Sequence, residues 1–580
     1  MDHFQSRRSF LAHSLKVGVG AAVSASITLK ENGIIARTIV PHRALPQAAA
    51  MQSHFVRLDE FIARHMRETG APGLTLSLAN KNGLIRVSTY GFADTKAHLS
   101  VVPETVFEIG SISKSFVALA LLQLRDEGKI DLNRPIVTYL PWLKIKSSFE
   151  PITTHHILSH TSGLPAVPLL PDTLLSEIPV TYGPGKKFLY SNTGYNILGF
   201  LIEAIDKRPF ADAIRERLLR PLEMSATYPI ITNESRRVMA IGYMPLIDDR
   251  PFPRNGALGE AQWMEVDLAA GSVASTPADM AKYLRMLVNR GALPKGRVIS
   301  EESFNLFVKP EINSPFRGED ASYGYGFWIS DIGGHTRLRH TGGMVAFSSS
   351  IDCDLTSGIG AFASVNATLQ QGYRPVAVTK YAVELLNASL KGTSLPDPPP
   401  PPVAPDKIAN AGDYAGTYSS PDDAKLVLEA KGDQLVMIYK NQRITLERAG
   451  RDLFIVKHPD FERYLLGFTR EADKVVEAFY GSTWYAGEAY SGPRTFNVPK
   501  DWEAYTGHFI NDSAWYGDTR VVLRKGQLFI DGVQPLISTG EARFATSDDS
   551  PDWIRFDSVI DGRAMRMSYS GIQFRRAFTP

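Results

Sequence analysis

A serine and a lysine stand three residues apart, at Ser111 and Lys114, just before a mostly apolar stretch from Phe116 to Leu124. The apolar stretch favours a buried helix. One helical turn would place both side chains on the same face, so that the lysine amine lies beside the serine hydroxyl that it must deprotonate. This spacing predicts an acyl-transfer site, although a serine at a helix start can also be a simple cap.

A second motif, Tyr190-Ser-Asn192, precedes another apolar helix. A tyrosine near a lysine can relay protons between a nucleophile and a leaving group. An asparagine amide can orient that lysine and bind a substrate carbonyl. Taken alone, Tyr190 could equally be a packed aromatic residue with a satisfied hydroxyl.

The third motif is His340-Thr-Gly342-Gly343, which lies between two strand-like segments. Glycines at a strand edge let a substrate backbone approach closely. A backbone amide at this position could complete an oxyanion hole together with the amide of Ser111. By itself, the motif could also be a simple turn.

Together and in this order, the three motifs resemble the serine β-lactamase and penicillin-recognising enzyme superfamily. The branch in question holds class C β-lactamases, D-alanyl-D-alanine carboxypeptidases, D-aminopeptidases and related esterases. The resemblance covers about residues 55 to 385 and implies no cofactor and no metal. The roles that it implies are nucleophile for Ser111, base and acid for Lys114 and Tyr190, positioning for Asn192, and substrate or oxyanion contacts for His340, Gly342 and Gly343.

One position departs from the pattern, because His340 stands where the β-lactamases and carboxypeptidases of the family usually have lysine. A histidine is mostly neutral at pH 7, so the recognition of a substrate carboxylate should weaken. This departure disfavours the hydrolysis of penicillins. The layout of the chain is also similar to that of three-domain D-aminopeptidases, in which a loop from a C-terminal barrel reaches the active site and restricts it to small substrates. The resemblance therefore implies a serine hydrolase that cleaves amide bonds of short peptides. The alternatives are an esterase with the same machinery, a β-lactamase or D-alanyl-D-alanine carboxypeptidase, and a non-catalytic protein that binds cell-envelope material.

The resemblance implies an α/β unit, in which helices flank an antiparallel sheet beside a helical subdomain. Alternating short strands after the proline-rich stretch at 396–402 predict two all-β, barrel-like modules. Their starts repeat, as Tyr414-Ala-Gly-Thr-Tyr418 and Tyr505-Thr-Gly-His-Phe509. The predicted parts are a leader at 1–50, the hydrolase unit at 51–392, a linker at 393–407 and β modules at 408–498 and 499–580.

Composition excludes several classes of protein. The 580 residues carry 63 basic and 61 acidic side chains with no basic block, which disfavours nucleic acid as a partner. Cys353 is the single cysteine, so no intrachain disulfide can form. His156 and His160 are four residues apart, but no glutamate follows His156 as in a zinc motif. The expected partner is a small molecule or short peptide, and the oligomeric state is left open.

The N-terminus resembles a twin-arginine export signal, with Arg7-Arg8 and then Phe10-Leu11 ahead of a mildly apolar stretch. A chance arginine pair in a disordered start is the alternative. Cleavage could fall near residues 48–50. No apolar run reaches the roughly 20 residues that span a bilayer, so we expect an exported protein of the bacterial periplasm without an integral span.

Overall fold

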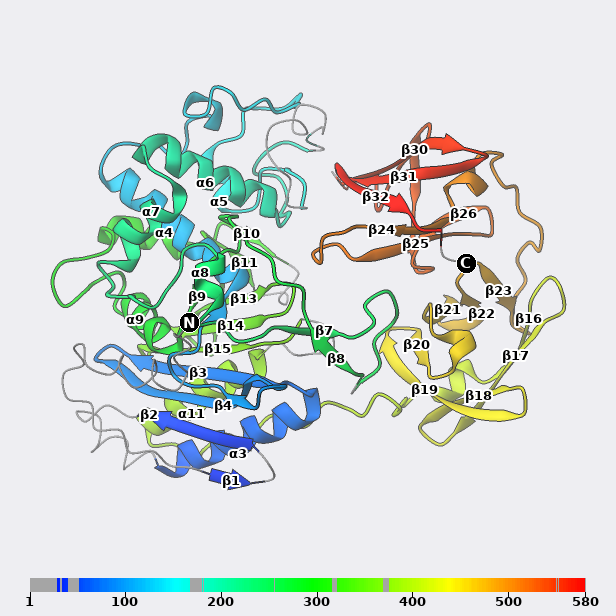
Figure 1. Ribbon diagram of the computed structural model, residues 1–580, viewed down its shortest axis with the longest axis horizontal. Helices are drawn as coiled ribbons and strands as arrows, with labels where there is room; N and C mark the ends of the chain where they lie inside the picture. The colour runs from blue at the N-terminus through cyan, green and yellow to red at the C-terminus, as the bar shows by residue number, and fades with distance from the viewer. Residues whose placement is uncertain are drawn as a thin grey trace, which may run out of the picture.

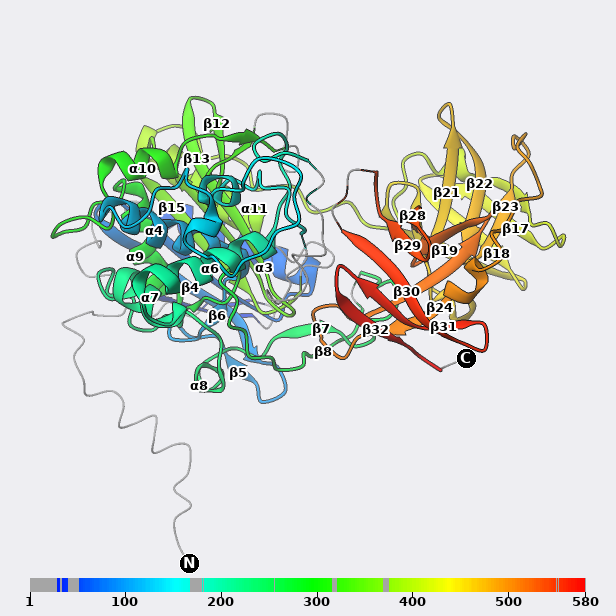
Figure 2. The same cartoon turned by 90° about the horizontal axis from the view of Figure 1, so that it is seen from above.

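The computed structural model describes residues 29–31, 34–39, 52–166, 180, 182–254, 256–314, 321–368, 375–548, 550 and 552–578. Figures 1 and 2 show an α/β unit on one side and two β modules on the other. The predicted fold class is confirmed. The arginine pair of the predicted export signal lies outside the described residues.

One large sheet, with antiparallel pairing throughout, forms the centre of the α/β unit. Its strands run in the order β1 (Leu29–Glu31), β2 (Ile34–Ile39), β4 (Gly83–Asp94), β3 (Gly73–Asn80), β15 (Ile359–Val365), β14 (Ser348–Asp354), β13 (His335–Gly343), β12 (Trp328–Ile332), β11 (Ser322–Tyr323) and β10 (Ile312–Asn313), with β5 (Leu99–Ser100) beside β4. Two short pairs are β6 (Phe107–Glu108) with β9 (Ala274–Ser275) and β7 (Tyr243–Pro245) with β8 (Leu258–Glu260). The strands β1 and β2 come from the segment predicted as a leader.

Helices cover both faces of this sheet. On one face, α3 (Gln52–Thr69) and α11 (Val376–Lys391) pack their apolar sides on β3 and β15. On the other face, α4 (Ser113–Asp126) and α9 (Pro277–Val288) form the larger core. The remaining α-helices are α5 (Thr154–Leu158), α6 (Asn192–Asp206), α7 (Phe210–Ile214), α8 (Asn233–Arg236) and α10 (Glu301–Phe307).

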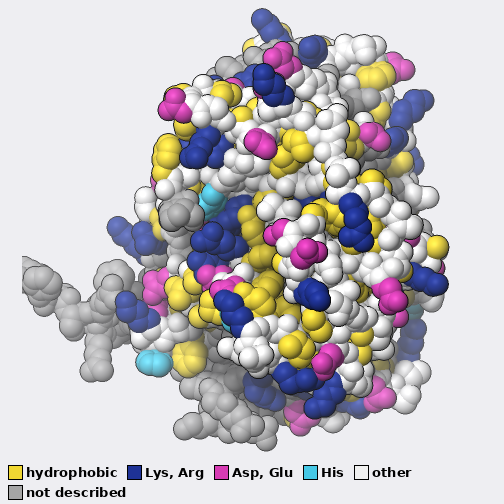
Figure 3. All heavy atoms as spheres, turned by 90° about the vertical axis from the view of Figure 1, so that its right-hand side faces the viewer, with side chains coloured by type: hydrophobic (Ala, Val, Ile, Leu, Met, Phe, Trp, Pro, Cys, Tyr) yellow, Lys and Arg dark blue, Asp and Glu magenta, His cyan; other side chains and the backbone are white. Residues whose placement is uncertain are grey.

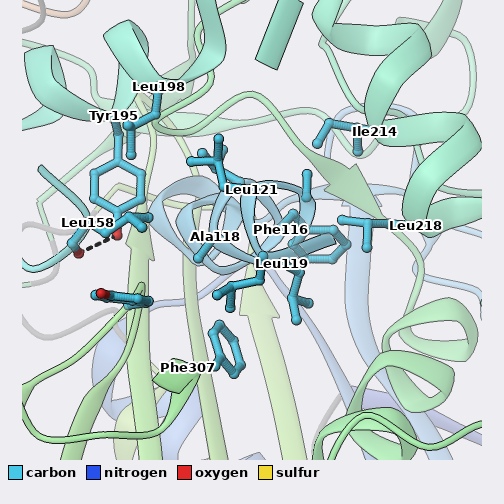
Figure 4. Close-up of a cluster of buried hydrophobic side chains, with 14 of the residues drawn as sticks. Phe116, Ala118, Leu119, Leu121, Leu158, Tyr195, Leu198, Ile214, Leu218 and Phe307 are labelled. Carbon is cyan, nitrogen blue, oxygen red and sulfur yellow. Dashed lines mark hydrogen bonds between the residues drawn. The ribbon is translucent and has the colours of Figure 1, made fainter. Parts of the chain in front are cut away.

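The helix α4 is buried along most of its length, and Figure 4 shows part of the apolar cluster around it. Its apolar residues point in every direction, which is the pattern of a buried helix. The ring of Phe116 stacks on Tyr283 with centroids 4.3 Å apart. Above the helix, the Tyr195 hydroxyl donates to the carbonyl of Leu158 at 2.8 Å. The polar side chains of its first turn, Ser113, Lys114 and Ser115, are therefore held away from water.

The two β modules follow in sequence. The first is a closed barrel of β16 (Gly416–Ser419), β17 (Lys425–Lys431), β18 (Gln434–Tyr439), β19 (Gln442–Gly450), β20 (Leu453–Val456), β21 (Leu466–Glu471), β22 (Lys474–Tyr480) and β23 (Thr483–Ala486). The second is one sheet in the order β27 (Gln534–Pro535), β26 (Gln527–Ile530), β25 (Asp518–Arg524), β24 (Gly507–Ile510), β32 (Ile572–Arg576), β31 (Arg563–Tyr569), β30 (Trp553–Ile560), β29 (Arg543–Ala545) and β28 (Ile537–Gly540). The order of this sheet leaves β27 and β28 as unpaired ends, so the second module is less closed than the first.

The two modules open alike. Each starts with a short 3₁₀ turn, at Ala411–Tyr414 and Trp502–Tyr505, followed by a glycine and a strand. The glycines, Gly416 and Gly507, have φ angles of 146° and 148°. Side chains rarely adopt these angles, so the repeated glycine in the two sequence motifs has a backbone cause.

The proline-rich stretch is tied to the α/β unit. The guanidinium of Arg57 in α3 pairs with Asp397 at 2.8 Å, and that of Arg64 donates to the carbonyl of Pro399 at 2.7 Å. The stretch is therefore docked along α3, as well as being stiff.

Within the described residues, no helix combines the length and the apolar character needed to cross a bilayer. Figure 3 shows charges of both signs scattered among hydrophobic side chains on the face of the β modules.

A clasp of two adjacent basic residues joins the two modules. The Arg524 guanidinium lies 4.0 Å from the ring centroid of Phe479 in the first module and 3.9 Å from that of Phe529 in the second. It donates to the carbonyls of Gly481 and Gly532, one in each module, at 2.7 and 2.8 Å. The neighbouring Lys525 binds the carboxylate of Glu477 and lies 5.0 to 5.1 Å from the rings of Trp484, Tyr490 and Phe496.

We expect the substitution Arg524→Ala to loosen the two modules from each other. Buried cation–π contacts and hydrogen bonds to a charged group contribute about 2 kcal/mol each, and they are not additive, so a loss of roughly 3 kcal/mol is expected. Calorimetry should show a lower transition midpoint for the modules, and proteolysis should cut faster between residues 488 and 500. Arg555→Ala is the control, because Arg555 lies over Trp553 of its own module. Equal behaviour of the two variants would contradict the clasp.

Candidate active site

The predicted nucleophile lies in a tight turn at the start of α4. Ser111 belongs to a 3₁₀ turn, Gly110–Ile112, and α4 begins two residues later at Ser113. This differs slightly from the prediction that Ser111 itself begins the helix. The Ser113 hydroxyl donates to the carbonyl of Gly110 at 2.7 Å and accepts the amide of Val273 at 3.1 Å, so the turn is fixed from two sides.

Glycine residues allow the end of β13 to lie directly against this turn. Gly110 has a φ of 53°, and a Cβ there would lie 2.6 Å from the amide nitrogen of Gly343. A Cβ on Gly342 would lie 1.9 Å from the carbonyl oxygen of Ile109. The sequence suggested that Gly342 and Gly343 admit a substrate backbone, and this stays a prediction. In the structure, Gly110 and Gly342 let β13 and the chain before Ser111 touch, which brings Gly343 beside Ser111.

Lys114 is fully buried, and its amine meets three acceptors. The distances from Nζ are 3.0 Å to Ser111 Oγ, 2.7 Å to Asn192 Oδ1 and 2.8 Å to the carbonyl oxygen of Ala270. Burial lowers the pKa of Lys114 well below its ordinary value, because the ammonium loses its hydration. The neutral amine is therefore favoured more than at an exposed lysine.

The three partners of Lys114 determine where a neutral amine points its lone pair. The oxygens of Asn192 and Ala270 can only accept, so the two N–H groups of the neutral amine go to them. Ser111 is the one partner of the three that can donate. The lone pair consequently faces the hydroxyl of Ser111, which is the arrangement that a general base requires.

Aromatic rings surround the amine. The ring centroid of Tyr190 is 4.8 Å from Lys114 Nζ, and that of Tyr195 is 5.5 Å away. The Tyr190 ring lies parallel to that of Trp328, with centroids 6.0 Å apart, and 4.3 Å from the ring of His160. The structure thus brings Tyr190, Asn192 and Lys114 together, as the sequence predicted. The role of Tyr190 as a proton relay stays a prediction.

The side chain of His340 lies behind the site and is only 2% exposed. Its ring packs 4.4 Å from Trp328, its Nε2 lies 3.2 Å from the hydroxyl of Tyr323, and its Nδ1 lies 2.7 Å from the carbonyl oxygen of Thr341. These contacts hold the imidazole within the protein. A buried ring is poorly placed to offer a charge to a substrate carboxylate, which strengthens the expectation drawn from the missing lysine.

The two histidines that were weighed as metal ligands do not share a helix face. The helix α5 ends at Leu158, and His160 follows it with a φ of 56°. Among the described residues, one group has the side-chain types of a metal site, namely Asp249, His508 and Asp518. Asp249 is already bound by the guanidinium of Arg520, so this group is part of the contact between the α/β unit and the second β module.

A loop of the second β module reaches the α/β unit. Residues 511–517 connect β24 to β25, and this loop points toward the α/β unit in Figure 1. Its Trp515 packs against an apolar cluster that includes Met344 and Phe347. The cluster continues directly from Gly343 at the end of β13. The resemblance implied that a loop of a C-terminal barrel reaches the active site, but the sequence did not show which loop, because Trp515 and Gly343 are 172 positions apart.

Sequence reasoning also missed the carbonyl of Ala270. It sits where it does because the side chain of Asn196 accepts the amide of Ala270 at 3.0 Å. A backbone acceptor leaves no residue-type signal.

Comparisons with known proteins agree with this geometry. A family model described as Beta-lactamase matches residues 58–387. PbpX of Bacillus subtilis (strain 168), a penicillin-binding protein by its name, is 25% identical over 280 residues, which are 47% of this chain and 66% of PbpX. Protein flp of Staphylococcus aureus (strain MW2) is 30% identical over 203 residues, which are 32% of this chain and 41% of flp.

A solved structure also shares the fold. The octameric penicillin-binding protein homologue from Pyrococcus abyssi aligns with a TM-score of 0.54 at 24% identity, over 74% of this chain and 99% of that one. At this identity the likeness concerns the fold. The chain spans 66% of the length of PbpX and 41% of that of flp.

Proposed function

Because this chain belongs to the beta-lactamase family, whose members are generally serine hydrolases, we propose that it cleaves amide bonds of short peptides through an acyl-enzyme on Ser111. The observation that carries the proposal is the buried Lys114 amine, which lies 3.0 Å from Ser111 Oγ and is also bound to two acceptors, Asn192 Oδ1 and the carbonyl oxygen of Ala270. Asn192 is the side chain that holds the amine in place.

The proposed reaction follows from this geometry. Neutral Lys114 takes the proton of Ser111 as Oγ attacks the substrate carbonyl carbon. The negative oxygen that forms would be bound by the backbone amides of Ser111 and Gly343. The proton then passes to the leaving amine, through Lys114 with Tyr190 as the proposed relay. In the second half, water attacks the acyl carbon and gives a proton to Lys114, and Ser111 Oγ takes that proton back as the acid leaves.

The buried position of His340 supports peptides over β-lactams, because the site lacks the exposed lysine that would hold the substrate carboxylate. Steady-state rates on peptide anilides, p-nitrophenyl esters and nitrocefin test this choice. We expect the highest kcat/KM on anilides of one or two residues. A preference for simple esters would indicate an esterase, and efficient nitrocefin turnover would indicate a β-lactamase. Binding without turnover of any of them would favour the non-catalytic alternative.

The Trp515 loop supports the restriction to short substrates. We expect Trp515→Ala to raise kcat/KM for peptides of five or six residues about tenfold relative to dipeptides, since a large side chain is removed beside the end of β13. The ratio of the two kcat/KM values is the measurement. Trp142→Ala is the control, because Trp142 is a 48% exposed tryptophan of the α/β unit that contacts Phe200 instead. An unchanged ratio in Trp515→Ala would separate this loop from substrate selection.

A further inference from the structure

We infer that His160 is a positioning residue that fixes the segment carrying Tyr190 and Asn192 against Lys114. The inference rests on the proposed function, since positioning matters for catalysis only if these residues act on substrate. His160 was considered above only as a metal ligand, and the proposed reaction does not use it. Its contacts give it a different task.

The carbonyl and the ring of His160 bind the chain on both sides of Tyr190. The amide of Leu189, one residue before Tyr190, donates to the His160 carbonyl at 2.8 Å. The amide of Ser191, one residue after it, donates to His160 Nδ1 at 3.0 Å. The imidazole also lies 4.3 Å from the Tyr190 ring. One residue thus determines both the backbone and the ring position of Tyr190.

The left-handed backbone of His160 makes this double contact possible. A φ of 56° is unfavourable for most residues with a side chain, and here it turns the carbonyl and the imidazole toward the same neighbouring segment. The following residues continue the contact. The Ser191 hydroxyl donates to the carbonyl of Pro165 at 2.6 Å, and the amide of Asn192 donates to that of Ala166 at 3.2 Å.

The protonation state of His160 suits this role. His160 is fully buried, and the loss of hydration on burial holds the pKa of His160 well below its usual value, which favours the neutral ring. Because Nδ1 accepts the Ser191 amide, the proton of the neutral ring is on Nε2. A protonated ring would lose that hydrogen bond.

Three substitutions separate the backbone from the side chain. In His160→Gly, glycine tolerates the left-handed φ but offers no side-chain acceptor for the Ser191 amide. In His160→Ala, alanine neither tolerates this φ well nor offers an acceptor. His160→Asn tolerates this φ and places Oδ1 the same number of bonds from Cα as Nδ1. We expect kcat to fall about 100-fold in the glycine and alanine variants with KM within threefold, and to recover to within about fivefold of wild type in the asparagine variant.

The second readout does not depend on activity. Hydrogen exchange of the Leu189–Asn192 segment should be faster in His160→Gly and close to wild type in His160→Asn, at similar melting temperatures. The inference would be overturned if His160→Gly matched wild type in both kcat and hydrogen-exchange rate. It would also be overturned if His160→Asn matched His160→Gly in both at equal stability. If wild type fails to label at Ser111 with a fluorophosphonate, the proposed function fails, while the exchange rates still show whether His160 holds this segment.

Discussion

The Ser111→Ala variant is expected to lose about 10⁴-fold or more in kcat/KM on the best peptide substrate while keeping its fold. The hydroxyl oxygen of Ser111 is the atom that would form the acyl bond, and it lies 3.0 Å from Lys114 Nζ, beside the two acceptor oxygens of Asn192 and Ala270. Steady-state kinetics measure the loss. Because the change removes one oxygen from a partly exposed turn, the melting temperature should stay near that of wild type.

Ser115→Ala is the matched control for this prediction. Ser115 lies one turn further along α4, where its hydroxyl contacts the carbonyl of Ile112 and the hydroxyl of Tyr283, both away from Lys114. We expect near-normal activity from this variant. Mass spectrometry with a fluorophosphonate should find one adduct on Ser111 in wild type and none in Ser111→Ala. Turnover that survives in Ser111→Ala would remove this serine from the mechanism.

The parts of the site that sequence could predict are those fixed by local geometry. The spacing of Ser111 and Lys114 needs only one turn of backbone to bring the two side chains together, and the structure places Nζ 3.0 Å from Oγ. Asn192 was predicted from the resemblance together with its own motif. The fold of the α/β unit was implied by the resemblance, whereas the two β modules were predicted from local strand patterns that follow the proline-rich stretch.

The parts that sequence could not predict depend on chain segments meeting in space. The carbonyl of Ala270 is a backbone acceptor 156 positions from Lys114, and it has no side-chain signature. The contacts of His160 depend on its left-handed φ, which residue type alone does not indicate for a histidine. The Trp515 loop depends on how the second module docks, through partners such as Arg520 and Asp249 on different units. Each of these required the assembled chain.

The pH dependence of kcat/KM should report the ionisation of Lys114. The ammonium cannot accept the proton of Ser111, so activity should fall as the pH drops through the lowered pKa of Lys114 and reach its plateau well below the ordinary lysine value of 10.5. Lys114→Arg keeps a positive charge that does not titrate below pH 12, so we expect a loss of about 10³-fold with no recovery up to pH 10. Steady-state measurements of kcat/KM from pH 5 to 10 for wild type and Lys114→Arg test both statements.

A negative charge placed beside the Lys114 amine should shift the acidic limb of the pH profile, where kcat/KM falls as the pH drops, in a known direction. In Asn192→Asp, a carboxylate would stand where Oδ1 now lies 2.7 Å from Nζ, and an opposite charge favours the ammonium. The acidic limb should therefore shift to higher pH by about one to two units relative to wild type. Glu108 is a second group that could titrate in this range, since burial raises its pKa to about 8. Glu108→Gln removes that ionisation. An acidic limb of the pH profile that persists in Glu108→Gln and shifts in Asn192→Asp belongs to Lys114. An acidic limb that stays at the same pH in Asn192→Asp would assign the role of base to another group.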